Sequence, residues 1–110
     1  MKKINICIAG NFNLAVECTD FLLKKFKQIQ IYAIFNSNDN GKDNFQKSFK
    51  KFCKKKKDIK SIDLKEAYNI SDLIFISLHF DKIIRTENFK SNKLYNIHFS
   101  LLPKYKGMHT

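Results

Sequence analysis

The stretch Ile4-Asn-Ile-Cys-Ile-Ala-Gly10 is a short apolar run, rich in β-branched residues, that ends in a glycine. Such a run predicts a buried strand that leads into a turn at residues 10–13. Apolar side chains then recur every fourth residue, at Leu14, Cys18, Leu22 and Phe26. This spacing predicts an amphipathic helix with Asn13 as its N-cap. The chain therefore begins with a strand, a turn and a helix.

Apolar runs predict three further strands, at residues 29–35, 72–78 and 94–98, and residues 58–63 predict a minor strand. Within residues 43–57, Phe45, Phe49 and Phe52 stand at helical spacing, which predicts a second helix that buries all three rings. Strands that alternate with helices imply right-handed βαβ units. We expect one α/β domain over residues 1–110, a Rossmann-like three-layer fold with a mostly parallel sheet that is truncated at the C-terminal side, and a site at the carboxyl ends of its strands.

Composition excludes several classes of protein. With 110 residues and 44% hydrophobic content, the chain has room for one packed core. No run approaches the roughly 20 apolar residues of a membrane span, and the N-terminus lacks a signal peptide, so we expect a soluble cytoplasmic protein. Cys7, Cys18 and Cys53 form no Cys-x-x-Cys pair and have no histidine at zinc-like spacing. We expect neither a disulfide nor a metal site.

Lysine supplies nearly all of the positive charge, since the formal net charge of +11 comes from twenty lysines and one arginine, Arg85. The run Lys54–Lys57 is the obvious candidate for contacts with nucleic acid or an acidic surface. Its lysines, however, are also what the solvated side of a helix with a buried phenylalanine stripe would carry. Aromatic rings that stack on bases would have to be exposed, so nucleic acid is a possible partner that we do not favour.

Two loops at the predicted carboxyl edge carry polar residues. The turn Gly10-Asn11-Phe12-Asn13 lacks the second and third glycines of a dinucleotide fingerprint, which argues against a nicotinamide cofactor. It can still present backbone N–H groups to another anionic group. His79 directly follows the strongest strand run, but a lone histidine there is as often structural as functional.

Asn96 and His98 stand two residues apart, so in an extended segment both side chains point to the same face. An amide donor and an imidazole can then converge on one bound atom. Ser100, Pro103 and Gly107 mark a loop that follows the pair.

The segment Asn96-Ile-His-Phe-Ser-Leu-Leu-Pro-Lys-Tyr-Lys-Gly107 resembles the signature of the formyltransferases that use 10-formyltetrahydrofolate, and eleven of its twelve positions fit. Phe99 stands where that family often has proline or a small residue. With residues 4–10 and 72–84, the resemblance covers essentially the whole chain as the N-terminal part of such an enzyme. Members of the family supply a third catalytic residue, an aspartate, further downstream. We therefore expect this chain to be inactive alone.

The resemblance implies transfer of a formyl group to an amine through a tetrahedral intermediate with an oxyanion. Asn96 would donate a hydrogen bond to that oxygen, and His98 would manage the proton of the amine. The resemblance implies a cofactor-binding set, Asp81, Lys82, Ile83, Ile84, Ser100, Leu101, Leu102 and Pro103. It implies a substrate-binding set at the first turn, Gly10, Asn11, Phe12 and Asn13. It implies no metal.

The sequence does not decide between several possible acceptor amines. The segments Phe80–Ile84 and Lys104–Met108 look most similar to the members that formylate a nucleotide-linked amino sugar. Methionyl-tRNA formyltransferase and glycinamide ribonucleotide transformylase are the alternatives within the family. A basic nucleic-acid-binding module without catalysis is an alternative of another class, and a truncated product with an open sheet edge is a third. The oligomeric state stays open.

Overall fold

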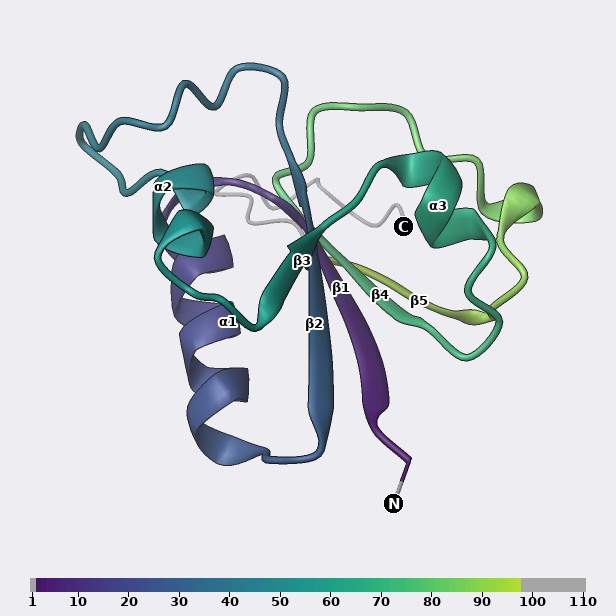
Figure 1. Ribbon diagram of the computed structural model, residues 1–110. Helices are drawn as coiled ribbons and strands as arrows, with labels where there is room; N and C mark the ends of the chain where they lie inside the picture. Colours follow the sequence, from purple (N-terminus) through teal and green to yellow (C-terminus); the bar gives the residue numbers. More distant parts are fainter. Residues whose placement is uncertain (1, 98–110) are drawn as a thin grey trace, which may run out of the picture.

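A five-stranded sheet forms the centre of the molecule in the computed structural model, which describes residues 2–97 (Figure 1). The strands are β1 (Ile4–Gly10), β2 (Ile29–Phe35), β3 (Ile59–Ser61), β4 (Ile74–Leu78) and β5 (Lys93–Ile97). They are ordered β3-β2-β1-β4-β5, and every pairing among them is parallel. The predicted α/β class and mostly parallel sheet are confirmed.

Helices cover both faces of the sheet and make three layers (Figure 1). The helices α1 (Phe12–Lys25) and α2 (Phe49–Lys54) lie on one face. The helix α3 (Leu64–Tyr68) and the 3₁₀ turn η1 (Thr86–Asn88) lie on the other. The chain winds outward from β1 to β3, then returns and continues through β4 to β5. The order reverses between β1 and β4, and in such sheets ligands bind beyond the carboxyl ends of the strands at this switch point.

The strand β1 is central because both of its faces are buried. Ile6 and Ile8 face the α1 and α2 layer and pack with Phe49. Cys7 and Ala9 face the opposite layer and belong to a second apolar cluster, with Phe75 and others. A strand covered on two sides reads as a continuous apolar run, which is why residues 4–10 were sufficient to predict it.

The first helix begins earlier than its apolar spacing predicts. Its N-cap is Asn11, whereas Asn13 was predicted. Its fully buried positions are Ala15, Val16 and Thr19, whereas the predicted stripe of larger side chains is only partly buried and Phe26 is 44% exposed. Small residues let the helix approach the sheet closely, so the contacting face is shifted from the most apolar face.

The second predicted helix is the main error. Only residues 49–54 are helical. Of the three phenylalanines expected to be buried, Phe49 is buried, Phe52 is partly buried against the core and Phe45 is fully exposed. Residues 36–48 form a loop because asparagine and aspartate side chains bond to its backbone N–H groups, which competes with helix formation.

The helix α3 was not predicted, although its start carries a recognisable signal. The Asp63 side chain accepts a hydrogen bond from the Glu66 N–H, and the Glu66 side chain accepts one from the Asp63 N–H. This is a capping box, and the Asp-x-x-Glu spacing in the sequence indicates such a helix start. Within residues 2–97 no helix has the length and apolar character needed to cross a membrane.

Candidate functional site

A cavity of about 680 Å³ opens at the carboxyl ends of β4 and β5, beside the switch point of the sheet. Its walls are mainly apolar and aromatic, with polar groups between them. The residues that line it are Phe12, Asn36, Asn38, Phe75, Ser77, His79, Phe80, Asp81, Lys82, Ile84, Thr86, Leu94, Tyr95 and Asn96. The volume and this mixture are typical of a site for a small organic molecule.

Parallel pairing of β4 with β5 sets the position of Asn96. It stands opposite Ser77 in the register, and both residues line the cavity. The amide of Asn96 is therefore carried by a strand, so its place on the wall is fixed by the sheet hydrogen bonds. The paired His98 lies outside the described residues.

The loops that follow β2 and β4 are joined across the end of β1. Asn36 is buried, its Nδ2 donates to the His79 carbonyl at 2.8 Å, and its Oδ1 accepts from the Asp81 N–H at 3.2 Å. The Ser37 N–H and Oγ in turn donate to the Asp81 carboxylate, the Oγ at 2.7 Å. We call this set of hydrogen bonds the loop clasp. It holds the segment that lines the cavity against the sheet.

The clasp also affects the charge of Asp81. Removal of solvent, the largest single effect, raises the pKa of its carboxyl, but the hydrogen bonds donated by Ser37 and by the backbone N–H groups of Asn38 and Asp81 together bring the pKa below its ordinary value of 3.8. A fixed negative charge therefore stands at the mouth of the cavity at neutral pH.

The turn between β1 and α1 presses closely on β4. A Cβ atom on Gly10, whose φ is +154°, would lie 1.8 Å from the Leu78 carbonyl oxygen. Two non-glycine residues at this edge of the sheet have a strained backbone, since Phe12, at the start of α1, has a φ of 73° and His79, after β4, a φ of 59°. Their rings meet edge to face with centroids 6.3 Å apart. Strain concentrated at the rim of a cavity is a frequent mark of a functional site.

The predicted cofactor-binding residues divide into three groups. Asp81, Lys82 and Ile84 line the cavity. Ile83 is 79% exposed and is not among the lining residues. Ser100, Leu101, Leu102 and Pro103 lie outside the described residues. The roles assigned to all of them stay predictions.

In the predicted substrate-binding turn, only Phe12 reaches this cavity. Gly10 provides the close approach to β4. The Asn11 Oδ1 accepts from the Phe49 N–H at 3.1 Å, and the Asn13 Oδ1 accepts from a backbone N–H at 2.7 Å. The two amides thus hold the turn against a neighbouring loop.

Sequence reasoning missed several wall residues. Asn36 and Asn38 follow the end of an apolar strand, as His79 does, so the rule that singled out His79 would have found them. Phe75 and Leu94 gave no such signal, since an apolar residue inside a strand is normally read as core.

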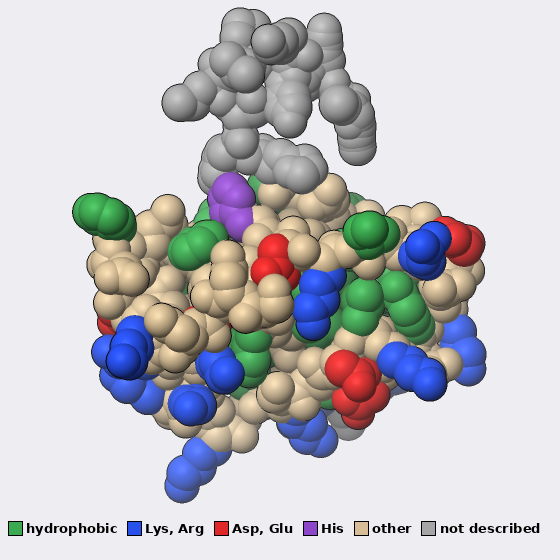
Figure 2. All heavy atoms as spheres, turned by 90° about the horizontal axis from the view of Figure 1, so that it is seen from above, with side chains coloured by type: hydrophobic (Ala, Val, Ile, Leu, Met, Phe, Trp, Pro, Cys, Tyr) green, Lys and Arg blue, Asp and Glu red, His purple; other side chains and the backbone are tan. Residues whose placement is uncertain are grey.

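The lysine run Lys54–Lys57, the candidate for contacts with nucleic acid, is exposed but does not line this cavity. Residues 54–57 are solvent-exposed, but only Lys54 belongs to α2 and the other three lysines follow its end, so they do not form the predicted helix face. Figure 2 looks onto the carboxyl edge of the sheet, where lysine side chains lie mainly along the periphery and apolar side chains reach the surface between them. Among residues 2–97 no three histidine, cysteine, aspartate or glutamate side chains cluster so as to hold a metal ion.

Two solved structures are similar to this chain over 94% of its length. One is an N-formyltransferase from Helicobacter canadensis in complex with folinic acid and dTDP-3-aminofucose, at 47% identity and a TM-score of 0.82. The other is WlaRD, a sugar 3N-formyl transferase in the presence of dTDP and 5-N-formyl-THF, at 50% identity and a TM-score of 0.83. The chain spans 38% of the length of each. No family model and no curated protein matches it.

Proposed function

Since the chain belongs to the formyltransferase family that uses 10-formyltetrahydrofolate, we propose that its cavity binds the folate formyl donor. In this proposal residues 1–110 are the N-terminal domain of an enzyme that formylates the amine of a nucleotide-linked amino sugar. The observation that carries it is the cavity at the switch point, because it occurs in a chain about half identical to two sugar N-formyltransferases.

The walls of the cavity fit a folate. A flat pteridine needs an apolar slot with a few fixed polar partners, and Phe75, Phe80 and Ile84 supply apolar surface there. Asn36 and Asp81 bring amide and carboxylate oxygens to the same wall. The bound cofactor would supply a formyl group on its N10 atom.

The chemistry assigned to the chain rests on Asn96. Its amide N–H is a suitable donor to the formyl oxygen, where negative charge develops during acyl transfer. A donor held by a strand loses little freedom when it makes that bond, and partly apolar walls strengthen the bond. His98 would accept the proton of the attacking amine.

The preference for a sugar amine rests on the two neighbours, whose substrates include a dTDP-linked amino sugar in one case. We further propose a cytoplasmic location. Cys7, Cys18 and Cys53 are all free thiols, which is usual in reducing compartments.

Titration of the folded chain with folinic acid, followed by calorimetry, tests the proposal. Ile84 and Ile83 offer a matched pair, because the first lines the cavity and the second is exposed beside it. A carboxylate placed in the apolar wall should weaken binding about tenfold in Ile84→Glu, since Ile84 is partly buried and an unpaired charge is costly beside apolar side chains. Ile83→Glu should bind like the wild type.

Absence of binding at millimolar folinic acid, in a chain shown to be folded by circular dichroism, would contradict the assignment of this cavity. Equal losses in the two isoleucine variants would contradict it too, because a general effect of added negative charge would then explain both.

A further inference from the structure

A second cavity, of about 430 Å³, opens at the amino ends of β1, β2 and β3, at the edge of the sheet opposite to the first cavity. In Figure 1 this edge includes the lower end of the molecule, where the N-terminus lies and where the chain passes from α1 into β2. The cavity is lined by four lysines, one aspartate and apolar side chains from α1 and β2. We call it the basic hollow.

The four lysines reach the basic hollow from separate parts of the chain. They are Lys3, Lys27, Lys57 and Lys60, and all of them are exposed. With Asp58 as the one carboxylate, four ammonium groups and one carboxylate give the lining a net charge of +3. The ion pairs within residues 2–97 engage other lysines. Like charges gathered in this way repel one another, and an anion that enters among them removes the repulsion.

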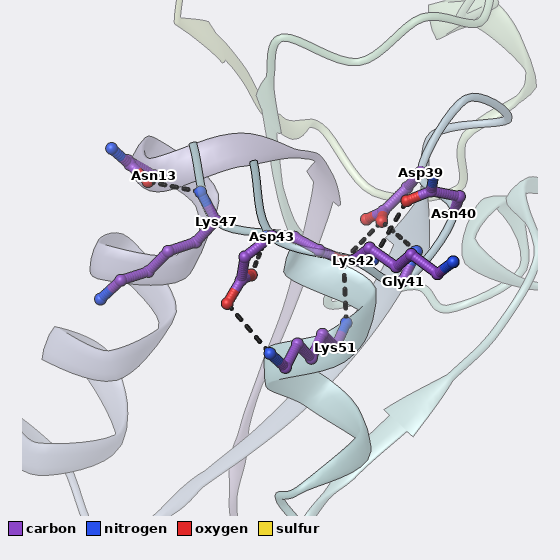
Figure 3. A network of polar contacts seen from close by, with 9 residues as sticks. Asn13, Asp39, Asn40, Gly41, Lys42, Asp43, Lys47 and Lys51 are labelled. Carbon is purple, nitrogen blue, oxygen red and sulfur yellow. Dashed lines mark hydrogen bonds and ion pairs between the residues drawn. The ribbon is translucent and has the colours of Figure 1, made fainter. Parts of the chain in front are cut away.

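Lysines elsewhere in the described part of the chain have partners of their own. Lys51 on α2 pairs with Asp43 at 3.1 Å (Figure 3). The hydrogen bond from the Ser48 N–H first, and the Lys51 contact second, lower the pKa of Asp43 below its ordinary value of 3.8, so this pair is charged at neutral pH. Lys24 pairs with Asp20 and also lies at the negative end of the α1 dipole. Among residues 2–97, the four lysines of the basic hollow lie neither in a helix nor in an ion pair.

Hydrogen bonds hold the walls of the basic hollow together. The Gln30 Nε2 donates to the Asp58 carbonyl at 3.0 Å, which joins the start of β3 to β2. The Ile4 N–H donates to the Gln28 carbonyl at 2.9 Å, which joins the start of β1 to the turn before β2. The segments that carry the lysines are therefore in place before any anion arrives, which lowers the ordering cost of binding.

Apolar side chains accompany the lysines at this edge. Leu23, Phe26 and Ile29 contribute apolar surface to the basic hollow, and Phe26 is 44% exposed. Phe26 belongs to neither of the core clusters that the described residues form. Ile4, at the start of β1, is 50% exposed. A partner that fits this surface combines negative charge with an apolar part.

Lysine without arginine favours a diffuse anionic surface over a partner with one fixed shape. Ammonium groups are point charges that need no set geometry, whereas specific nucleic-acid recognition relies largely on the planar guanidinium. The one arginine of the chain, Arg85, does not line the hollow. Lys25 and Lys56 are exposed and directly adjoin lining residues in the chain, so the positive charge extends beyond the hollow.

From this combination we infer that the amino edge of the sheet docks on a membrane surface that carries anionic phospholipids. Headgroup phosphates lie among the four lysines, and Phe26 enters the boundary between headgroups and acyl chains. The first cavity, at the opposite edge, then faces the water. The inference adds a place to the proposed function, the cytoplasmic leaflet of a membrane, and it rests on that function only for the cytoplasmic location.

Sedimentation of the full chain with vesicles tests this surface. The chain should bind vesicles of phosphatidylcholine and phosphatidylglycerol in equal parts, should not bind vesicles of phosphatidylcholine alone, and should be released by salt. The double variant Lys27→Gln/Lys57→Gln should bind the mixed vesicles about 25-fold more weakly, because each lysine near such a surface contributes about fivefold.

Lys42→Gln/Lys65→Gln is the matched control, because it removes the same charge from other places. Lys42 lies in the loop at residues 36–48, where its N–H donates to the Asn40 Oδ1 (Figure 3), and Lys65 lies on α3. Neither lysine lines the basic hollow. This control should bind the mixed vesicles within about twofold of the wild type.

Two exposed phenylalanines of this region separate insertion from charge. Phe26→Ala should weaken binding to the mixed vesicles about fivefold, because a half-exposed ring no longer leaves the water. Phe21→Ala should leave binding unchanged, since Phe21 is 58% exposed on α1 but does not line the basic hollow. Equal losses in these two variants would contradict the insertion of Phe26.

Three outcomes would overturn the docking surface. Equal losses in the two lysine double variants would show that net charge alone explains the binding. Failure of the wild-type chain to bind the mixed vesicles at low salt would leave the surface without its partner. Tighter binding to duplex DNA than to the mixed vesicles, with the same dependence on Lys27 and Lys57, would assign the hollow to nucleic acid instead.

Folinic acid titration of the same variants keeps this inference separate from the proposed function. None of the substituted residues lines the first cavity, so all of the variants should bind folinic acid like the wild type. A chain that binds folinic acid but not the mixed vesicles would overturn the docking surface alone. A chain that binds the vesicles but not folinic acid would support the docking surface and contradict the proposed function.

Discussion

Replacement of Asn36 by alanine tests whether the loop clasp determines the shape of the cavity. The Asn36 side chain is 4% exposed and makes two hydrogen bonds, one to the His79 carbonyl and one from the Asp81 N–H. Each such bond contributes about 1 kcal/mol net. The substitution should therefore lower the free energy of unfolding by about 2 kcal/mol, and the midpoint of thermal unfolding by about 10 °C for a domain of this size.

Loss of the two Asn36 hydrogen bonds should also alter the ligand site, because the segment that they hold carries Asp81 and Ile84, which line the cavity. We expect Asn36→Ala to weaken folinic acid binding at temperatures where the variant is still folded. Asn36→Asp is a stricter test, since it keeps the acceptor for the Asp81 N–H but places a carboxylate against the His79 carbonyl. It should destabilise at least as much as alanine.

Thermal unfolding followed by circular dichroism measures the loss of stability. Asn92→Ala is the control, because Asn92 is exposed and takes no part in the loop clasp. A midpoint for Asn36→Ala within the error of the control would refute the reasoning. It would mean that water replaces both hydrogen bonds without cost.

Three further predictions concern backbone, charge and thiols. Gly10→Ala should prevent stable folding, because its Cβ would clash with a β4 carbonyl, whereas Gly41→Ala, with open space and a φ of +80°, should cost only about 1 kcal/mol in denaturant unfolding. Because the pKa of Asp43 is lowered in the folded chain, its carboxylate adds stability above pH 3.8, and this stability is lost as the pH falls through the folded-state pKa. In acid titration the free energy of unfolding should therefore fall less for Asp43→Asn than for the wild type. An equal fall in both would contradict this. Burial raises the pKa of Cys7, and raises that of Cys53 to about 12, so both thiols should react with a disulfide reagent only after unfolding; rapid reaction of either in the native chain would show that its site opens.

The sheet could be predicted because its signals are local. Residues 4–10, 29–35 and 72–78 are continuous apolar runs, and a strand buried on both faces needs nothing else to be recognised. The parallel pairing of the strands was predicted from their alternation with helices, whereas their order, β3-β2-β1-β4-β5, was found only in the structure. The length of α2 could not be predicted, since periodicity at Phe45 and Phe49 does not show that nearby Asn and Asp side chains bond to the backbone.

The sequence by itself determined the α/β class and the resemblance to the formyltransferases, and it singled out Asn96, whose catalytic role stays a prediction and which the structure places on the cavity wall. These depend on local pattern and on which residue types are adjacent in the chain. Only the tertiary structure decided that Asn36 joins two loops, that Ile84 and not Ile83 lines the cavity, and that Phe45 is exposed. Contacts between residues some forty positions apart depend on which strand ends meet at one edge of the sheet, and no local pattern contains that information.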